Sequence, residues 1–123
     1  MEEDTLRNMK AYVDTANAVV VDERTTGGEV VKIPILNLMQ LPQALLAVAN
    51  NVAMFMERVT GRGYQKAEEV YDQGYTIREP GHQAYGVKVT VEENCVIVSR
   101  VAILEDETIF DRYVKYLQTG ILV

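Results

Sequence analysis

The stretch from Ile33 to Met56 contains no charged side chain, and this feature most constrains the fold of the chain. Its second half, continuing to Val59, is rich in Leu, Ala and Met and lacks glycine, which predicts one long helix from Leu41 to Val59. Pro42 is tolerated in the first helical turn, and Gly61 is well placed to end the helix. Because apolar residues nearly surround this helix, we expect it to be buried on more than one side.

Two faces of the predicted helix have different expected partners. The face assigned to a β-sheet comprises Leu41, Leu45, Val48, Val52, Phe55 and Val59. Small residues on the remaining face would allow another backbone to approach closely, and a second copy of the chain is the simplest partner. The sequence therefore predicts a homodimer whose interface contains Ala47, Asn50, Ala53, Met54 and Glu57.

A membrane span is not expected from the charge-free stretch. Polar residues and prolines divide it into apolar runs much shorter than the roughly 20 residues that a bilayer requires. These interruptions are Pro34, Asn37, Gln40, Pro42, Gln43, Asn50 and Asn51. The N-terminus begins with acidic residues and lacks an apolar signal core, so we expect a cytoplasmic protein.

Length and charge narrow the function classes. The chain of 123 residues is long enough for one domain, residues 1–123, with its own core. Its 12 basic and 18 acidic residues give a net charge of −6, and the basic residues are scattered. Nucleic acid and anionic membranes are therefore poor candidate partners.

The remaining elements follow from short periodic patterns. The N-terminus predicts an amphipathic helix, and two β-branched runs around paired glycines predict a hairpin from about Ala18 to Ile35. The segment from Tyr64 to Gly74 is compatible with either a helical turn or an edge strand. Further strands are predicted at YTIRE, AYGVKVTVEE and CVIVSRVAIL, with a turn at Glu93-Asn94.

The strand that begins at Cys95 is apolar on both faces, so we expect it at the centre of the sheet, with Val98 and Val101 in the core. Asp106 is expected to cap a closing helix that Gly120 ends. The resulting fold class is α/β, an α+β sandwich. It has a roughly five-stranded, mainly antiparallel sheet, a long central helix and two terminal helices, in the order α-β-β-α-β-β-β-α.

This order of elements resembles that of the roadblock/dynein light chain superfamily. The resemblance rests on ANAVVVDERTTGGEVV, ALLAVANNVAMFMERVTGRG, EEVYDQGYTI, AYGVKVTVEE and CVIVSRVAIL, and it covers nearly the whole chain as a pattern. A profilin-like or secretion-chaperone-like arrangement has nearly the same order of elements. Membership in the roadblock superfamily would imply a scaffold or regulator that presents a surface to a small Ras-like GTPase or to a larger complex.

No pattern predicts a catalytic, cofactor or metal site. His82 lies in a polar turn, Cys95 begins a β-branched strand, and nothing in their spacing brings them together. The acidic groups fall mostly at helix starts and at a hairpin turn, where acids favour the helix dipole or stay solvated. The glycine pairs are too short for a phosphate loop.

The sequence therefore favours a non-enzymatic homodimeric interaction module that tethers or regulates a protein such as a small GTPase. The alternative is a small acidic chaperone or viral accessory protein that covers an apolar segment of its partner. A group of tyrosines is a further candidate binding surface, because tyrosine is favoured at interfaces. They are Tyr64, Tyr71, Tyr75 and Tyr85.

Overall fold

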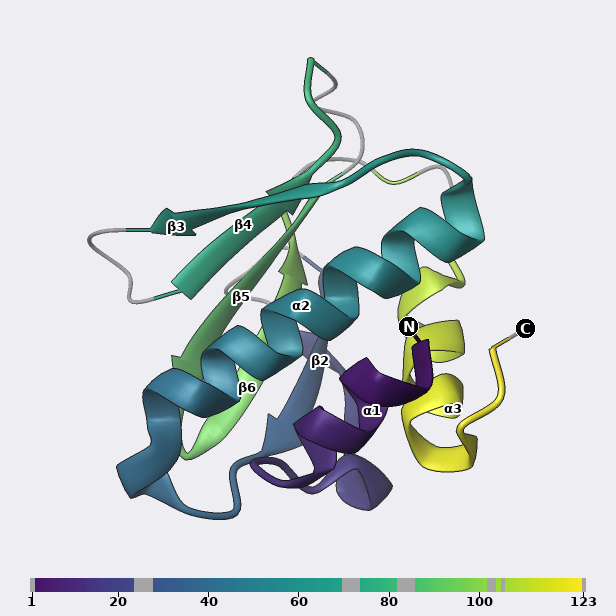
Figure 1. Ribbon diagram of the computed structural model, residues 1–123. Helices are drawn as coiled ribbons and strands as arrows, with labels where there is room; N and C mark the ends of the chain where they lie inside the picture. The colour runs from purple at the N-terminus through teal and green to yellow at the C-terminus, as the bar shows by residue number, and fades with distance from the viewer. Residues whose placement is uncertain are drawn as a thin grey trace.

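Six strands form one antiparallel sheet, and three α-helices lie on one of its faces in the computed structural model (Figure 1). The structure describes residues 2–23, 28–69, 74–81, 86–101, 104 and 106–122, and these counts refer to them. The elements are α1 (Glu2–Lys10), β1 (Val19–Glu23), β2 (Gly28–Pro34), α2 (Leu41–Thr60), β3 (Gln65–Glu69), β4 (Gly74–Arg78), β5 (Gly86–Glu92), β6 (Cys95–Arg100) and α3 (Ile109–Thr119). Short 3₁₀ turns occupy Thr15–Asn17 and Leu38–Gln40.

The strand order across the sheet is β1-β2-β6-β5-β4-β3, and every neighbouring pair is antiparallel. The predicted α+β class, the long central helix and the antiparallel sheet are confirmed. The expected strand number was wrong, because the ambiguous segment after the central helix forms β3, an edge strand paired only with β4. Its continuation at residues 70–73 lies outside the described residues.

Two hairpins follow the predicted pattern. β1 pairs with β2, with Val21 opposite Val30; the turn at residues 24–27 lies outside the described residues. Glu93 and Asn94 connect β5 to β6 with φ angles of 49° and 67°. Two consecutive residues with positive φ are typical of the tight type I′ turn, whose twist matches that of the flanking strands.

The strand β6 lies between β2 and β5, as its two apolar faces predict. Val96 and Val98 are buried in the core beneath the helices, and Ile97 is buried on the opposite face. The prediction for Val101 was wrong: 46% of this residue is exposed. β6 ends at Arg100, so Val101 no longer has neighbouring strands on both sides.

Glycines end both long helices in the left-handed conformation. Gly61 has a φ of 71° and donates its N–H to the Glu57 carbonyl, and Gly120 has a φ of 76° after α3. Asp106 is not the N-cap residue of α3, because the helix begins at Ile109 and Thr108 is the residue before it. Asp106 instead accepts the Thr108 N–H at 2.8 Å in the turn that leads into the helix.

The core lies between the sheet and the helices. Phe55 of α2 packs against two tyrosines of α3, with ring centroids 5.0 Å from Tyr113 and 5.7 Å from Tyr116. The stripe of α2 assigned to the sheet is buried at Leu45, Val48, Val52 and Phe55 and half-buried at its two ends. In Figure 1, α2 runs diagonally across the sheet, with α1 and α3 beside it.

Candidate interaction surface

One side of α2 is not covered by the fold. The α2 outer face consists of residues along this side: Met39, Gln43, Leu46, Asn50, Ala53 and Glu57. Met39 lies in the 3₁₀ turn at Leu38–Gln40, which leads directly into α2. Met39 is 89% exposed and Leu46 is 41% exposed, whereas Asn50 and Ala53 are half-buried.

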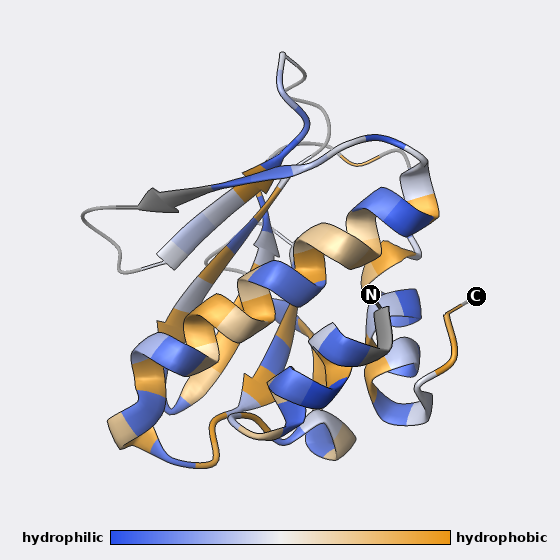
Figure 2. Ribbon diagram, viewed as in Figure 1, coloured by the Kyte–Doolittle hydropathy of each residue, from blue (hydrophilic) through white to orange (hydrophobic). Residues whose placement is uncertain are grey.

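Exposed apolar side chains are concentrated near the start of this face. Seven large hydrophobic residues are exposed among the described residues, and four of them lie between the end of β2 and the second turn of α2. These four are Leu36, Leu38, Met39 and Leu46. Figure 2 shows this loop as largely hydrophobic. Single exposed apolar residues are ordinary, but such a concentration on one segment is typical of interaction surfaces.

Most of the apolar residues of α2 that do not face the sheet are covered by other parts of the same chain. The sequence interpretation assigned them to a second copy, but α1 packs along one flank of α2 and α3 lies beside both. Ala47, one of the predicted interface residues, is only 3% exposed and therefore cannot contact a partner without rearrangement. The other four predicted positions, Asn50, Ala53, Met54 and Glu57, retain partial or full exposure.

A buried polar network joins the three helices on that flank. Asn51 is completely buried and donates from Nδ2 to Thr5 Oγ1 at 3.1 Å and to the Tyr116 hydroxyl at 3.0 Å. The Tyr113 hydroxyl donates to Asn51 Oδ1 at 2.8 Å. The pKa of Tyr113 is raised well above its usual value, mainly by burial and to a smaller extent by the neighbouring Tyr116. The sequence assigned Asn50 to the predicted interface and gave Asn51 no role in the core, yet Asn51 is the asparagine that enters it.

A mainly apolar cavity of about 260 Å³ lies between the end of α2 and the start of α3. It is lined by Met56, Val59, Thr60, Arg62, Leu104, Asp106 and Ile109. Both charged side chains at this cavity already have partners. Arg62 Nε lies 3.6 Å from Glu79 Oε2, and Asp106 Oδ2 lies 2.6 Å from Arg112 Nη1.

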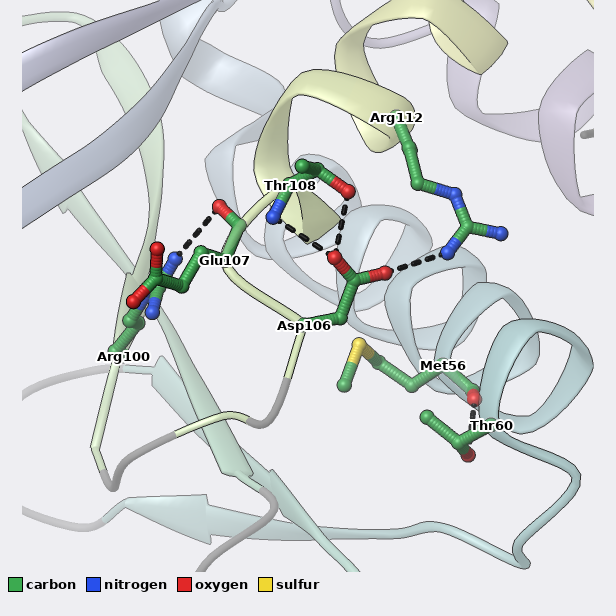
Figure 3. Close-up of polar contacts among 7 residues, drawn as sticks. All are labelled: Met56, Thr60, Arg100, Asp106, Glu107, Thr108 and Arg112. Carbon is green, nitrogen blue, oxygen red and sulfur yellow. Dashed lines mark hydrogen bonds and ion pairs between the residues drawn. The ribbon is translucent and has the colours of Figure 1, made fainter.

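The Asp106 carboxylate is held by the turn before α3 (Figure 3). The pKa of Asp106 is lowered below its ordinary value. The largest cause is the hydrogen bond from the Thr108 hydroxyl, and the Thr108 N–H and the Arg112 guanidinium lower the pKa further. An acid held ionised by a hydroxyl, an amide and a guanidinium acts as a fixed anion that orders the helix start. Nearby, the Arg100 guanidinium donates to the Glu107 carbonyl at 3.2 Å.

Of the two residues considered for chemistry, the structure describes only Cys95. Cys95 is a free, half-buried thiol at the start of β6, opposite Pro34 and Glu92. His82 lies outside the described residues, as do Tyr71 and Tyr85 of the tyrosine group. Tyr64 and Tyr75 are half-buried and pack against the core. Within the described part of the chain, no group of three His, Cys, Asp or Glu side chains could hold a metal ion.

The helix α2 with its preceding turn, Leu38–Thr60, has the length and apolar composition that a membrane span requires. It is the only such helix in the described residues, and 44% of its apolar window is buried inside the fold. Core helices of soluble proteins meet the same criterion, so length and composition are a weak indication of a span.

Comparisons with known proteins leave the family open. No protein-family model, curated protein or solved structure matches the chain. The resemblance to the roadblock superfamily therefore stays a prediction from the order of elements.

Proposed function

We propose that this chain is a non-enzymatic interaction module that functions as a homodimer and presents a surface to a protein partner. The observation that carries the proposal is the concentration of exposed apolar side chains at the start of α2, including Leu38, Met39 and Leu46. Covering such side chains stabilises a complex by roughly 25 cal/mol per Å² of apolar surface, before the entropic cost of association.

The partner named by the sequence resemblance is a small Ras-like GTPase. Its support is the order of elements alone, so it is the more specific part of the proposal. A pull-down with purified Ras-like GTPases loaded with GDP or a non-hydrolysable GTP analogue tests it. Binding that depends on the nucleotide supports a regulatory role, whereas no binding in either state removes the GTPase and leaves the homodimer unaffected.

The second candidate is a small acidic chaperone that covers an apolar segment of another protein. The same apolar surface and the net charge of −6 favour it. In a chaperone the exposed apolar residues bind a client segment, so an amphipathic client peptide competes with self-association. In both readings we propose a cytoplasmic protein in which α2 packs against the sheet and does not cross a membrane.

Ala53→Arg tests the homodimer. Ala53 is half-buried on the α2 outer face, and an arginine there would place an unpaired charge in a close helix contact. We expect the wild-type protein to have twice the 13.8 kDa mass of one chain in light scattering at micromolar concentration, and the variant to be monomeric. Arginine is a good helix former, so circular dichroism should be unchanged.

The matched control is Ala16→Arg, which makes the same change at an exposed residue in the 3₁₀ turn before β1. It should remain dimeric. A wild-type protein of 13.8 kDa at these concentrations would refute the homodimer. A dimer that persists in Ala53→Arg would place the interface elsewhere.

A further inference from the structure

The cavity between the end of α2 and the start of α3 has an apolar inner wall and a polar rim. Three of the side chains that line it, Met56, Leu104 and Ile109, are at most 4% exposed and form the inner wall. The polar lining residues are half-exposed and form the rim; they are Thr60, Arg62 and Asp106. An apolar group that displaces poorly ordered water from such a wall gains binding free energy.

The inner wall of this cavity can change its shape. Met56 and Ile109 also line a second, much smaller cavity of about 10 Å³ inside the core, together with the aromatic residues Phe55, Phe110 and Tyr113. Figure 3 shows the Met56 side chain extending from α2 toward the turn before α3. Because methionine is unbranched and has three rotatable bonds, rotation of Met56 can adapt the wall to an inserted ring.

The Asp106 carboxylate at the rim keeps one acceptor position. Its Oδ1 accepts the N–H and the hydroxyl of Thr108, at 2.8 and 2.5 Å, and these two bonds use both of its lone pairs. Its Oδ2 accepts from Arg112 Nη1 at 2.6 Å and retains one further lone pair among the described residues. The Asp106 side chain is 39% exposed, so a molecule in the cavity can reach this oxygen.

The charges at the rim favour an uncharged ligand. Asp106 is paired with Arg112, and Arg62 Nε lies 3.6 Å from Glu79 Oε2, so both charged lining residues are already compensated. An anion would lie beside the Asp106 carboxylate, and a cation would have to compete with Arg112 for it. The Thr60 hydroxyl already donates to a carbonyl of its own helix and accepts the Arg62 N–H.

We propose that this cavity binds an uncharged small molecule with an apolar body and one O–H or N–H group, which donates to Asp106 Oδ2. A cavity of roughly 150 Å³ holds benzene, so the 260 Å³ of this cavity is enough for a two-ring molecule of the size of indole. None of the lining residues belongs to the α2 outer face, so this binding site is separate from the surface of the proposed homodimer.

Three related probes test the ligand class on the unaltered chain by NMR titration of the backbone amides. Indole combines an apolar two-ring body with one N–H donor, and we expect a dissociation constant of roughly 0.1–1 mM with amide shifts at Thr60, Leu104 and Ile109. 1-Methylindole lacks the donor and should bind at least about fivefold more weakly. Indole-3-acetate carries a negative charge and should also bind at least about fivefold more weakly than indole.

Filling the cavity from the protein side is the second test. Val59 is half-buried and lines the cavity, so Val59→Phe should occupy part of its volume and lower the affinity for indole at least about fivefold. Val19→Phe is the matched control: it makes the same change at an exposed residue of β1 that does not line the cavity, and it should bind indole as the wild type does. Circular dichroism confirms that each variant is folded.

Each negative outcome overturns the proposal at a definite point. If indole at up to about 5 mM causes no amide shifts, the cavity is not a binding site. Shifts confined to residues 36–46 would place indole on the exposed apolar loop instead. Equal affinities for indole and 1-methylindole would refute the hydrogen bond to Asp106. The homodimer is measured separately by light scattering, so it can stand when the binding site fails.

Discussion

At the scale of single residues, the two adjacent asparagines of α2 have opposite environments. Asn50 is half-buried on the outer face, whereas Asn51 is completely buried and bonds to residues of α1 and α3. A buried amide is stabilising only when its donors and acceptors have partners, and all three hydrogen bonds of Asn51 go to other helices. Asn51 therefore helps to specify how the helices pack.

Asn51→Ala should lower the free energy of unfolding by about 2–4 kcal/mol, because it removes three side-chain hydrogen bonds of a completely buried residue and leaves a cavity. Urea denaturation followed by circular dichroism measures the change. Asn8→Ala makes the same substitution at an exposed position of α1 and should change stability by less than about 0.5 kcal/mol. Equal effects of the two variants would contradict the role of Asn51.

The raised pKa of Tyr113 predicts a loss of stability at high pH. The folded state keeps this hydroxyl protonated above pH 10, where the unfolded chain releases its proton. The unfolded state then binds fewer protons than the folded state, so the free energy of unfolding falls as pH rises from about 10 toward the folded-state pKa.

Denaturant melts between pH 8 and pH 11 measure this slope. Tyr113→Phe is the control: it lacks the ionisable hydroxyl, so its stability should fall less steeply above pH 10, although its stability at pH 8 is lower because Asn51 Oδ1 loses a donor. Identical slopes in the two proteins would show that Tyr113 does not cause the loss.

At the scale of elements, position within the sheet decides how much a side chain contributes. Val98 lies in β6, opposite Val31 of β2 and Val89 of β5. Val101 follows the end of the same strand and is exposed. The same residue type, three positions apart, therefore has core packing in one case and solvent contact in the other.

Val98→Ala should lower the free energy of unfolding by about 1–3 kcal/mol, since it removes two buried methyl groups from a filled core. Val101→Ala is the matched control and should stay within about 0.5 kcal/mol of wild type. Thermal melts at one protein concentration compare them. A larger loss in Val101→Ala than in Val98→Ala would contradict the placement of the end of β6.

At the scale of the whole molecule, the packing of the helices on the sheet decides which side of α2 is buried in the core and which side is left as a candidate interaction surface. The helices cover one face of the sheet, and α1 and α3 also cover a flank of α2, so only one side of that helix stays available. The proposed function depends on this side and needs no reactive side chain. It therefore makes a prediction about the only histidine and the only cysteine of the chain.

The double variant His82→Gln with Cys95→Ala should retain its dimeric mass and its partner binding. It removes the only imidazole and the only thiol, which histidine-based or thiol-based catalysis could not survive. Light scattering and pull-down from the native host measure the two properties. A folded, dimeric variant that has lost all biological activity would point to a site involving these residues and would refute the scaffold proposal.

Much of the local structure could be predicted from sequence because its causes are local. Alternating valines predicted β5, the Glu93-Asn94 turn was recognised from turn-forming residues, and Gly61 and Gly120 end their helices as expected. β3 was ambiguous because a short polar edge strand lacks a buried face to give it periodicity. Of the five residues predicted for the dimer interface, four are partly or fully exposed to solvent, whereas Ala47 is buried.

The sequence by itself determined that α2 is a long, nearly charge-free helix that requires burial on several sides, because composition and helical period are properties of consecutive residues. Only the tertiary structure decided what buries it. Whether Ala47 and Asn51 meet α1 and α3 or a second copy depends on contacts between distant segments, such as Asn51 with Tyr116. Helical periodicity shows that a face is apolar, but the same apolar face is satisfied equally by any surface that excludes water from it.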